Sequence, residues 1–96
     1  MTITVSKYYP LKEFLLRSGK SRVKTTFSEI ERVLGFRLPS SARNHRAWWS
    51  NDRSHPQARS GWLAAGFKVE HVDFDNGLVY FAKRGGVDLE RGKETR

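Results

Sequence analysis

The sequence contains no cysteine, and it also lacks any long hydrophobic run. Without cysteine, the chain can form neither a disulfide framework nor a thiolate metal site. No apolar stretch approaches the roughly 18 residues that a membrane-spanning helix needs. Residues 1–20 also lack the hydrophobic stretch of a secretory signal. These absences predict a cytoplasmic protein that does not associate with membranes.

The length of the chain favours a single domain. Its 96 residues lie close to the usual domain size of about 100–150 residues. We expect this domain to span residues 1–84. Residues 85–96 include only two apolar side chains, so we expect them to form a disordered tail.

The charge is unevenly distributed along the chain. Lysine and arginine number 18 against 10 acids, which gives a formal net charge of +8. Residues 1–36 and 37–66 each have four more bases than acids, whereas bases and acids balance in residues 67–96. Such an excess on a small domain favours a polyanionic partner, and nucleic acid first among these.

The N-terminal part of the sequence predicts a short strand or arm over residues 1–7 and then a first helix. In "YYPLKEFLLRSG", Pro10 suits the first turn, and Gly19 stands where a glycine commonly ends a helix. The polar stretch of residues 20–26 has Val23 at its centre and predicts a brief strand.

A capping box predicts the start of a second helix. In "TFSE", the Thr26 hydroxyl can accept the backbone N–H of Glu29, while the Glu29 carboxylate can accept that of Thr26. Apolar residues follow at helical spacing, and Gly35 ends the pattern.

Two further helices are expected before the C-terminal part of the domain. Ser40 is a suitable N-cap for a third helix that ends near Asn51. A fourth helix is predicted to start at Ser54, with Pro56 in its first turn, and to end at Gly66.

The C-terminal part of the domain predicts a β-hairpin. "FKVEHVDF" and "LVYFAKR" alternate apolar and polar residues around "DNG". Asn-Gly is a strong hairpin signal because both residues tolerate a positive φ. We therefore expect two antiparallel strands in residues 67–84.

The order of these elements is close to that of a winged helix-turn-helix domain, an α+β fold with three to four short helices and a C-terminal β-hairpin. In that fold the short strand joins the hairpin in a three-stranded sheet. The connection between the second and fourth predicted helices differs from that of a helix-turn-helix. About twenty residues separate Leu34 from His55, whereas a helix-turn-helix has only a few residues between its two helices. Either residues 40–51 are an inserted helix, or they form the recognition helix themselves.

Several strings of the sequence are similar to those of a known family. "YYPLKEFL", "FSEIERVLG", "LPSSAR", "AWWSN" and "GWLAAGF" together resemble a family of small bacterial proteins of unknown function, over roughly residues 8–84. The resemblance implies no catalytic residues, so function has to be inferred from the residues themselves.

The segment of residues 40–65 carries the strongest functional signal. Within "SARNHRAWWSNDRSHPQARSGW" there are four arginines and three tryptophans, but no lysine and one acid. Arginine can hold phosphate or the edge of guanine with two hydrogen bonds, and asparagine or glutamine can pair with adenine in the same way. The predicted nucleic-acid contacts here are Arg43, Asn44, Arg46, Arg53, Gln57 and Arg59. We expect Trp49 in the core and Trp48 at its boundary.

Bases outside this segment suit contacts that do not depend on nucleotide sequence. Lys20, Arg22 and Lys24 follow the first predicted helix, and Lys83 and Arg84 stand at the base of the hairpin. The hairpin tip carries Asp73 and Asp75, which phosphate would repel. We therefore expect the tip to stay away from a nucleic-acid backbone.

No motif of a catalytic site is present. Asp73 and Asp75 flank a turn where aspartate is expected for local hydrogen bonds. The three histidines lack the close spacing of a metal site. We therefore predict no enzymatic activity, no metal and no cofactor.

The resulting hypothesis is a non-catalytic protein that binds nucleic acid, with double-stranded DNA as the partner and regulation of transcription as the role. Binding to DNA would place it at the nucleoid, and a homodimer is compatible with the sequence. The alternative is a protein-interaction module or a small inhibitor-like protein that binds an acidic partner. Arginine and tryptophan are also enriched at protein interfaces, so composition does not separate the two hypotheses.

Overall fold

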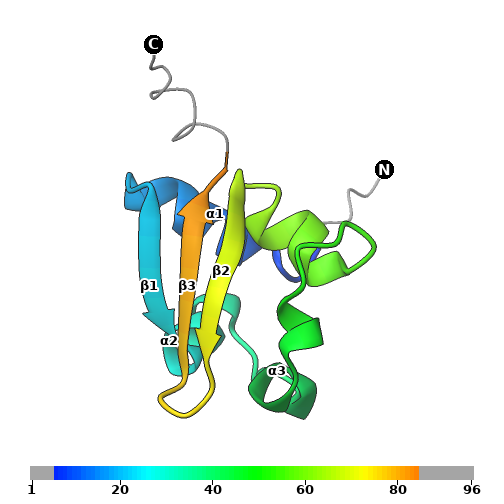
Figure 1. Cartoon of the computed structure of the whole chain (residues 1–96). Coiled ribbons are helices and arrows are strands. Elements are labelled where there is room, and N and C mark those ends of the chain that lie inside the picture. The colour runs from blue at the N-terminus through cyan, green and yellow to red at the C-terminus, as the bar shows by residue number, and fades with distance from the viewer. Residues whose placement is uncertain (1–5, 85–96) are drawn as a thin grey trace, which may run out of the picture.

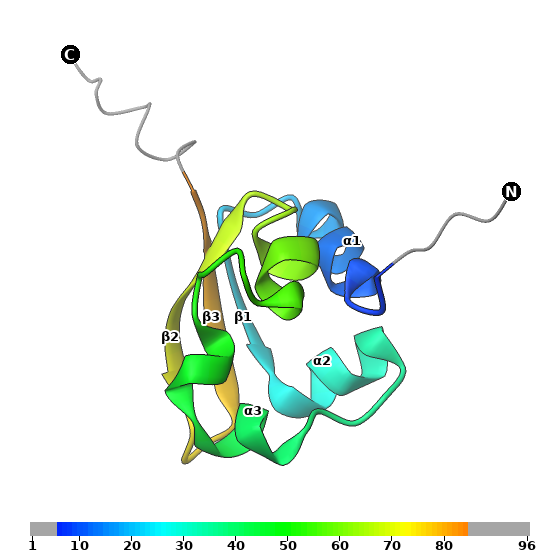
Figure 2. The same ribbon diagram turned by 90° about the vertical axis from the view of Figure 1, so that its right-hand side faces the viewer.

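In the computed structural model, which describes residues 6–84, helical segments cover one face of a three-stranded antiparallel sheet (Figure 1 and Figure 2). The elements in chain order are α1 (Tyr9–Ser18), β1 (Arg22–Thr26), α2 (Phe27–Leu34), α3 (Ser40–Asn44), η1 (Arg46–Trp49), η2 (Ala58–Trp62), β2 (Phe67–Asp73) and β3 (Leu78–Lys83). The predicted tail of residues 85–96, and residues 1–5 of the predicted N-terminal strand or arm, lie outside the described residues.

The predicted first helix and the strand that follows it are confirmed. Leu11 and Leu15 face the core of the domain and are each 1% exposed. Gly19 follows α1 with a φ of 67°, a left-handed conformation that glycine adopts without a steric penalty. This turn leads directly into β1.

The capping box at the start of α2 is only half formed. The Thr26 hydroxyl accepts the backbone N–H of Glu29 at 2.9 Å, as predicted. The Glu29 carboxylate instead accepts the hydroxyl of Thr25 at 2.7 Å, and the Phe27 N–H donates to the carbonyl of Gly77 in the hairpin turn. The predicted bond from the Thr26 N–H to Glu29 is therefore wrong, because a buried threonine takes up the carboxylate.

The sheet has the strand order β1-β3-β2, so β1 joins the hairpin as predicted. The inner face buries two cross-strand rows. Phe81 lies between Val23 and Val69, and Val79 lies between Thr25 and Val72. The register shifts between Val69 and His71. This bulge leaves both Glu70 and His71 exposed.

The predicted hairpin is confirmed, and its turn comprises residues 74–77. In the Asn-Gly pair, Gly77 alone has a positive φ, at 67°. The Asp73 carboxylate accepts both the backbone N–H and the side-chain amide of Asn76. The aspartate thus stabilises the turn by local hydrogen bonds.

The predicted third helix over residues 40–51 is wrong in its length. After α3 the chain becomes extended at His45, with φ −129° and ψ 123°, and then forms a 3₁₀ helix, η1. This break allows the Trp49 indole N–H to reach back to the Ala42 carbonyl at 2.7 Å while both residues are buried. The N-cap position is Pro39, and Ser40 is the first residue of the helix.

The predicted fourth helix is shorter than expected. Helical backbone starts at Pro56, two residues after the predicted Ser54, and residues 58–62 form the π-helix η2. The Leu63 N–H donates to the Ala58 carbonyl at 2.9 Å, five residues back. Gly61 lies against α1, where an added Cβ would sit 3.5 Å from Leu11. Close packing against α1 thus accompanies this irregular helix.

An aromatic cluster fills the space between the sheet and the helices. The rings of Trp49 and Trp62 stack at 5.6 Å, and Phe27 stacks on Trp49 at 5.8 Å. Trp49 and Trp62 are 0% exposed, while Trp48 is half-buried against them. The predicted positions of Trp48 and Trp49 are confirmed.

The domain is thus α+β with short helices and a C-terminal hairpin. No helix of residues 6–84 is long and apolar enough to cross a membrane.

Candidate functional site

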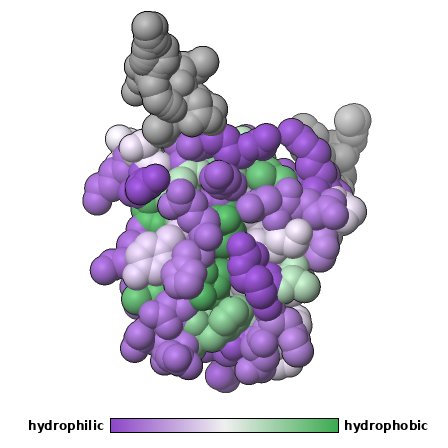
Figure 3. Space-filling view, in the orientation of Figure 1, coloured by the Kyte–Doolittle hydropathy of each residue, from purple (hydrophilic) through white to green (hydrophobic). Residues whose placement is uncertain are grey.

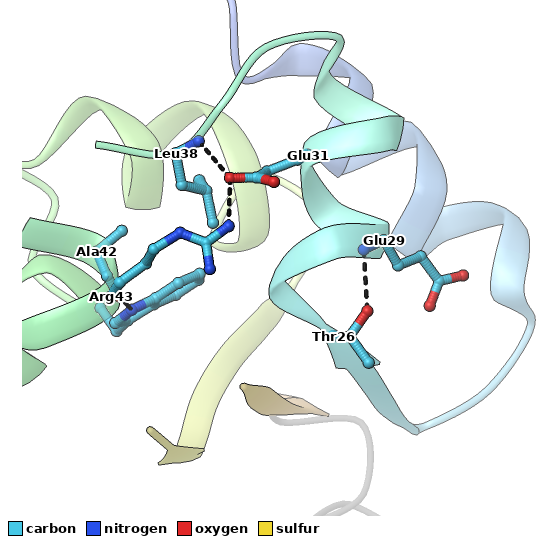
Figure 4. Close-up of polar contacts among 7 residues, drawn as sticks. Thr26, Glu29, Glu31, Leu38, Ala42 and Arg43 are labelled. Carbon is cyan, nitrogen blue, oxygen red and sulfur yellow. Dashed lines mark hydrogen bonds and ion pairs between the residues drawn. The ribbon is translucent and has the colours of Figure 1, made fainter. Parts of the chain in front are cut away.

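Arg43, predicted to contact nucleic acid, is held by an acid of α2 (Figure 4). Its guanidinium donates to the Glu31 carboxylate at 2.6 Å and lies over the Phe27 ring, 5.5 Å from the centroid. The same oxygen of Glu31 accepts the Leu38 N–H at 2.8 Å. The hydrogen bond from Arg43, followed by that from Leu38, lowers the pKa of Glu31. Arg43 therefore joins α3 to α2, and this use occupies its charge.

The two amides predicted to read adenine are also used within the fold. Gln57 is 6% exposed, and its amide donates to the Trp48 carbonyl at 2.9 Å. Asn44 is exposed, but its amide donates to the Ser40 carbonyl of its own helix. Gln57 cannot reach a ligand from this position unless the domain rearranges.

The remaining arginines of residues 40–65 point to solvent. Arg46, Arg53 and Arg59 are all exposed. The Arg59 guanidinium donates to the Arg53 carbonyl at 2.9 Å, so these two residues lie together. Arg46 belongs to η1 and precedes Trp48 and Trp49 in the sequence, whereas Arg53 and Arg59 follow them.

Asn51, which the sequence analysis did not select, stabilises the edge of the sheet. Its carboxamide oxygen accepts the Val69 N–H at 2.8 Å, and its NH₂ group donates to the Val69 carbonyl at 3.0 Å. The same oxygen accepts the indole N–H of Trp62 at 2.9 Å. Asn51 thereby replaces a neighbouring strand beside β2. Its place after "AWWS" gave no local signal for this role, because both partners lie far along the chain.

Bases from three separate stretches meet at one end of the sheet. Cross-strand pairing places Arg22 and Lys68 on either side of Ala82. The backbone N–H of Lys83 donates to Ser21, and that of Arg84 donates to Gly66. We call this surface the basic end, and it comprises Lys20, Arg22, Lys68, Lys83 and Arg84, all of them exposed.

The sequence predicted four members of the basic end but did not bring them together. Lys68 was not predicted, because nothing in its local sequence showed that the sheet register would place it beside Arg22. Lys24 is also exposed and lies two residues beyond Arg22 on the same face of β1. Knowledge of the sheet register was needed to see that these residues share one surface.

The acids of the sheet are mostly remote from the basic end. Glu70 pairs with Arg22 at 3.4 Å. Asp73 and Asp75 lie at the opposite end of the strands, at the hairpin turn (Figure 1). Hydrogen bonds from the Asn76 side chain and backbone lower the pKa of Asp73. The sheet therefore has a positive end and a negative end.

The described residues gather positive charge at one end of the sheet. Residues 6–84 contain no group of three or more histidine, aspartate or glutamate side chains that could hold a metal ion. The fold and the basic end thus define a small α+β domain with a polarised, basic surface.

The chain belongs to a family described as a domain of unknown function (DUF7662). The family model matches residues 8–84, which confirms the resemblance found in the sequence. Neither curated proteins nor solved structures give a match.

Proposed function

We propose that the protein binds nucleic acid without catalysing a reaction, that double-stranded DNA is the partner, and that it acts by occupancy, as a transcription regulator does. The observation that carries this proposal is the convergence of Lys20, Lys68, Lys83, Arg84 and Arg22 on one end of the sheet. Lysine and arginine side chains in this arrangement can contact the phosphates of a nucleic-acid backbone. Such contacts supply most of the affinity of sequence-independent binding.

The arrangement of elements supports a winged-helix version of this proposal. The sheet order β1-β3-β2 and the position of η2 directly before β2 support this version, in which residues 40–49 would be an insertion between the second and third helices. In this scheme η2 takes the place of the recognition helix. Ala58, Gly61 and Trp62 of η2 are buried, and Arg59 is exposed. We therefore expect contacts with phosphates to outweigh contacts with base edges.

The structure weakens the alternative of an acidic protein partner. That hypothesis depended on tryptophan as an anchor beside arginine, but Trp49 and Trp62 are 0% exposed and Trp48 is half-buried. Without exposed tryptophan rings, the Arg-rich segment lacks the tryptophan anchors on which that hypothesis depended. Its charge alone fits a polyanion better.

Fluorescence anisotropy of a labelled duplex tests the proposal. We expect the affinity for a mixed-sequence duplex to fall by orders of magnitude between about 50 and about 200 mM salt. The triple substitution of Lys68, Lys83 and Arg84 by alanine should reduce the slope of log affinity against log salt by about 3, or about 1 for each lost contact.

Arg32→Ala is the matched control, because Arg32 is an exposed arginine on α2, towards the hairpin end of the sheet (Figure 1). It should bind as the wild type does. The proposal fails if no nucleic acid binds at the lower salt concentration. A triple variant with the wild-type salt slope would instead show that the basic end is not the contact surface.

A further inference from the structure

The outer face of the sheet has no helix packed on it in the described part of the chain. All the helices lie on the opposite side, where the inner face forms the core (Figure 2). The space-filling view of the outer face shows mainly hydrophilic side chains, with hydrophobic surface between them (Figure 3). A ligand can therefore approach this face directly from solvent.

The register of the strands arranges this face in cross-strand rows that run away from the basic end. The rows are Arg22, Ala82 and Lys68, then Lys24, Tyr80 and His71, and then Thr26, Leu78 and Asp73. Lysine and arginine side chains occur in the first two rows, while the acid of the third row lies beside the hairpin turn. Glu70, in the bulge, pairs with Arg22. Positive charge and aromatic rings therefore meet in the second row.

Tyr80 and His71 form the aromatic part of the second row. Their ring centroids are 5.6 Å apart, and the planes are tilted by 38°. Tyr80 is half-buried on the central strand, whereas His71 is exposed on β2. Lys24 is the partner of Tyr80 on the other side. An aromatic ring thus lies between a lysine and an imidazole on a solvent-facing sheet.

We propose that this outer face binds a single-stranded stretch of nucleic acid, with bases stacked on Tyr80 and His71 and phosphates held by Lys24 and the basic end. The inference rests on the proposed function and names single-stranded nucleic acid as a second ligand beside the duplex. Bases in a duplex are already stacked on one another, so an aromatic row contributes little to duplex binding. Unpaired bases stack on exposed rings of any sheet that also offers positive charge for the backbone.

The charge pattern gives the bound strand a direction. The row from Lys24 to His71 spans two interstrand distances, about 10 Å, so it accommodates a short stretch. Asp73 repels phosphate beyond this row, while Lys68, Lys83 and Arg84 attract it on the other side. The strand therefore leaves the aromatic row towards the basic end, where a duplex would be held. A duplex with a single-stranded overhang satisfies both surfaces.

The test compares Tyr80→Leu, Tyr80→Phe and the control Tyr9→Leu. Tyr9 is a 40% exposed tyrosine on α1, away from the outer face. For a short labelled single strand, Tyr80→Leu should weaken binding by about 5-fold to about 100-fold, the range of one lost stacking contact. Tyr80→Phe and Tyr9→Leu should bind as the wild type does, and no variant should change the affinity for a blunt duplex.

A 2-aminopurine in the single strand reports stacking directly, because its fluorescence is quenched when it stacks. We expect quenching with the wild type and Tyr80→Phe, and little quenching with Tyr80→Leu. Because His71 is exposed, His71→Ala should fold even if Tyr80→Leu does not, and it should also reduce the quenching.

The outcomes separate this inference from the proposed function. If the duplex binds but no variant alters single-strand affinity or quenching, the stacking surface is wrong and nucleic-acid binding stands. Equal weakening of duplex and single strand by Tyr80→Leu also overturns the inference. If neither nucleic acid binds at low salt, both proposals fail.

Discussion

The Arg-rich segment of residues 40–65 and the basic end of the sheet differ in how far their polar side chains take part in the fold. The segment has the higher density of arginine in the sequence, yet Arg43 pairs with Glu31 and Gln57 is buried against Trp48. The basic end collects Lys20, Lys68 and Arg84 and their neighbours from three stretches that lie far apart in the sequence. A count of basic residues along the chain therefore does not show which of them share one surface.

The buried tryptophans explain this difference. Trp49 and Trp62 each need a hydrogen-bond acceptor for the indole N–H once they leave water. They obtain these acceptors from the Ala42 carbonyl and from Asn51, both within the same segment. Some polar residues of the segment are therefore used to build the fold, whereas Arg22 of the basic end pairs with Glu70 on the exposed outer face of the sheet.

The substitution Asn51→Leu should have the largest effect on this comparison. It leaves the indole N–H of Trp62 and the N–H of Val69 without their side-chain acceptor; Trp62 and Val69 are nearly inaccessible, whereas Asn51 itself is exposed. We expect the free energy of unfolding to fall by about 2–4 kcal/mol, since each unsatisfied buried donor costs about 1–3 kcal/mol. Urea denaturation measures this change.

Asn44→Ala is the matched control, because Asn44 is an exposed asparagine whose amide bonds only within α3. Its effect should stay within about 0.5 kcal/mol. Equal effects of the two substitutions would show that Asn51 has no special structural role.

The pair Arg43→Ala and Arg46→Ala should separate stability from binding. Arg43→Ala removes a charge-assisted hydrogen bond at the surface of the core and should destabilise the domain by about 1–2 kcal/mol. Arg46 is exposed on η1, so its replacement should change stability by less than about 0.5 kcal/mol. Thermal unfolding distinguishes the two.

In nucleic-acid binding we expect Arg46→Ala to have the larger effect and Arg43→Ala the smaller one. Arg46→Ala should reduce the salt slope by about 1 if this residue contacts a phosphate. Arg43→Ala should leave the slope unchanged at a temperature where the variant is folded. A reduced slope for Arg43→Ala would mean that the ion pair with Glu31 opens on binding.

The smallest expected effect is the dependence of the Arg43–Glu31 pair on pH. The pKa of Glu31 is lowered in the folded protein by its hydrogen bonds. The pair therefore stabilises the fold above the ordinary pKa of glutamate, and this contribution is lost as the pH falls through the lower, folded-state pKa. The difference in unfolding free energy between the wild type and Glu31→Gln should shrink by less than about 1 kcal/mol from about pH 7 to about pH 3. A difference that stays constant over this range would contradict the role of the ion pair.

Much of the fold was predictable from local signals. Pro10 and Gly19 delimit α1, Thr26 caps α2, and Asn76 with Gly77 mark the hairpin turn. Each of these signals acts over a few residues and depends on backbone geometry alone. Local chemistry therefore determined the order of the elements and the α+β class.

The irregular helices of residues 40–62 were beyond such signals. The break at His45 goes with the placement of Trp49 near Ala42, and the π-helical form of η2 goes with the approach of Gly61 to α1. Helical spacing alone favoured longer helices, because it contains no information on which distant group accepts an indole N–H.

For the candidate site, the residue types could be identified from the chain alone, whereas their accessibility depends on the folded arrangement. The excess of bases, the absence of cysteine and the acidic hairpin tip are properties of the chain. Whether an arginine faces solvent, like Arg46, or an acid, like Arg43, depends on partners distant in sequence. The basic end and the row of Lys24, Tyr80 and His71 exist only because the register of antiparallel strands brings separate stretches side by side.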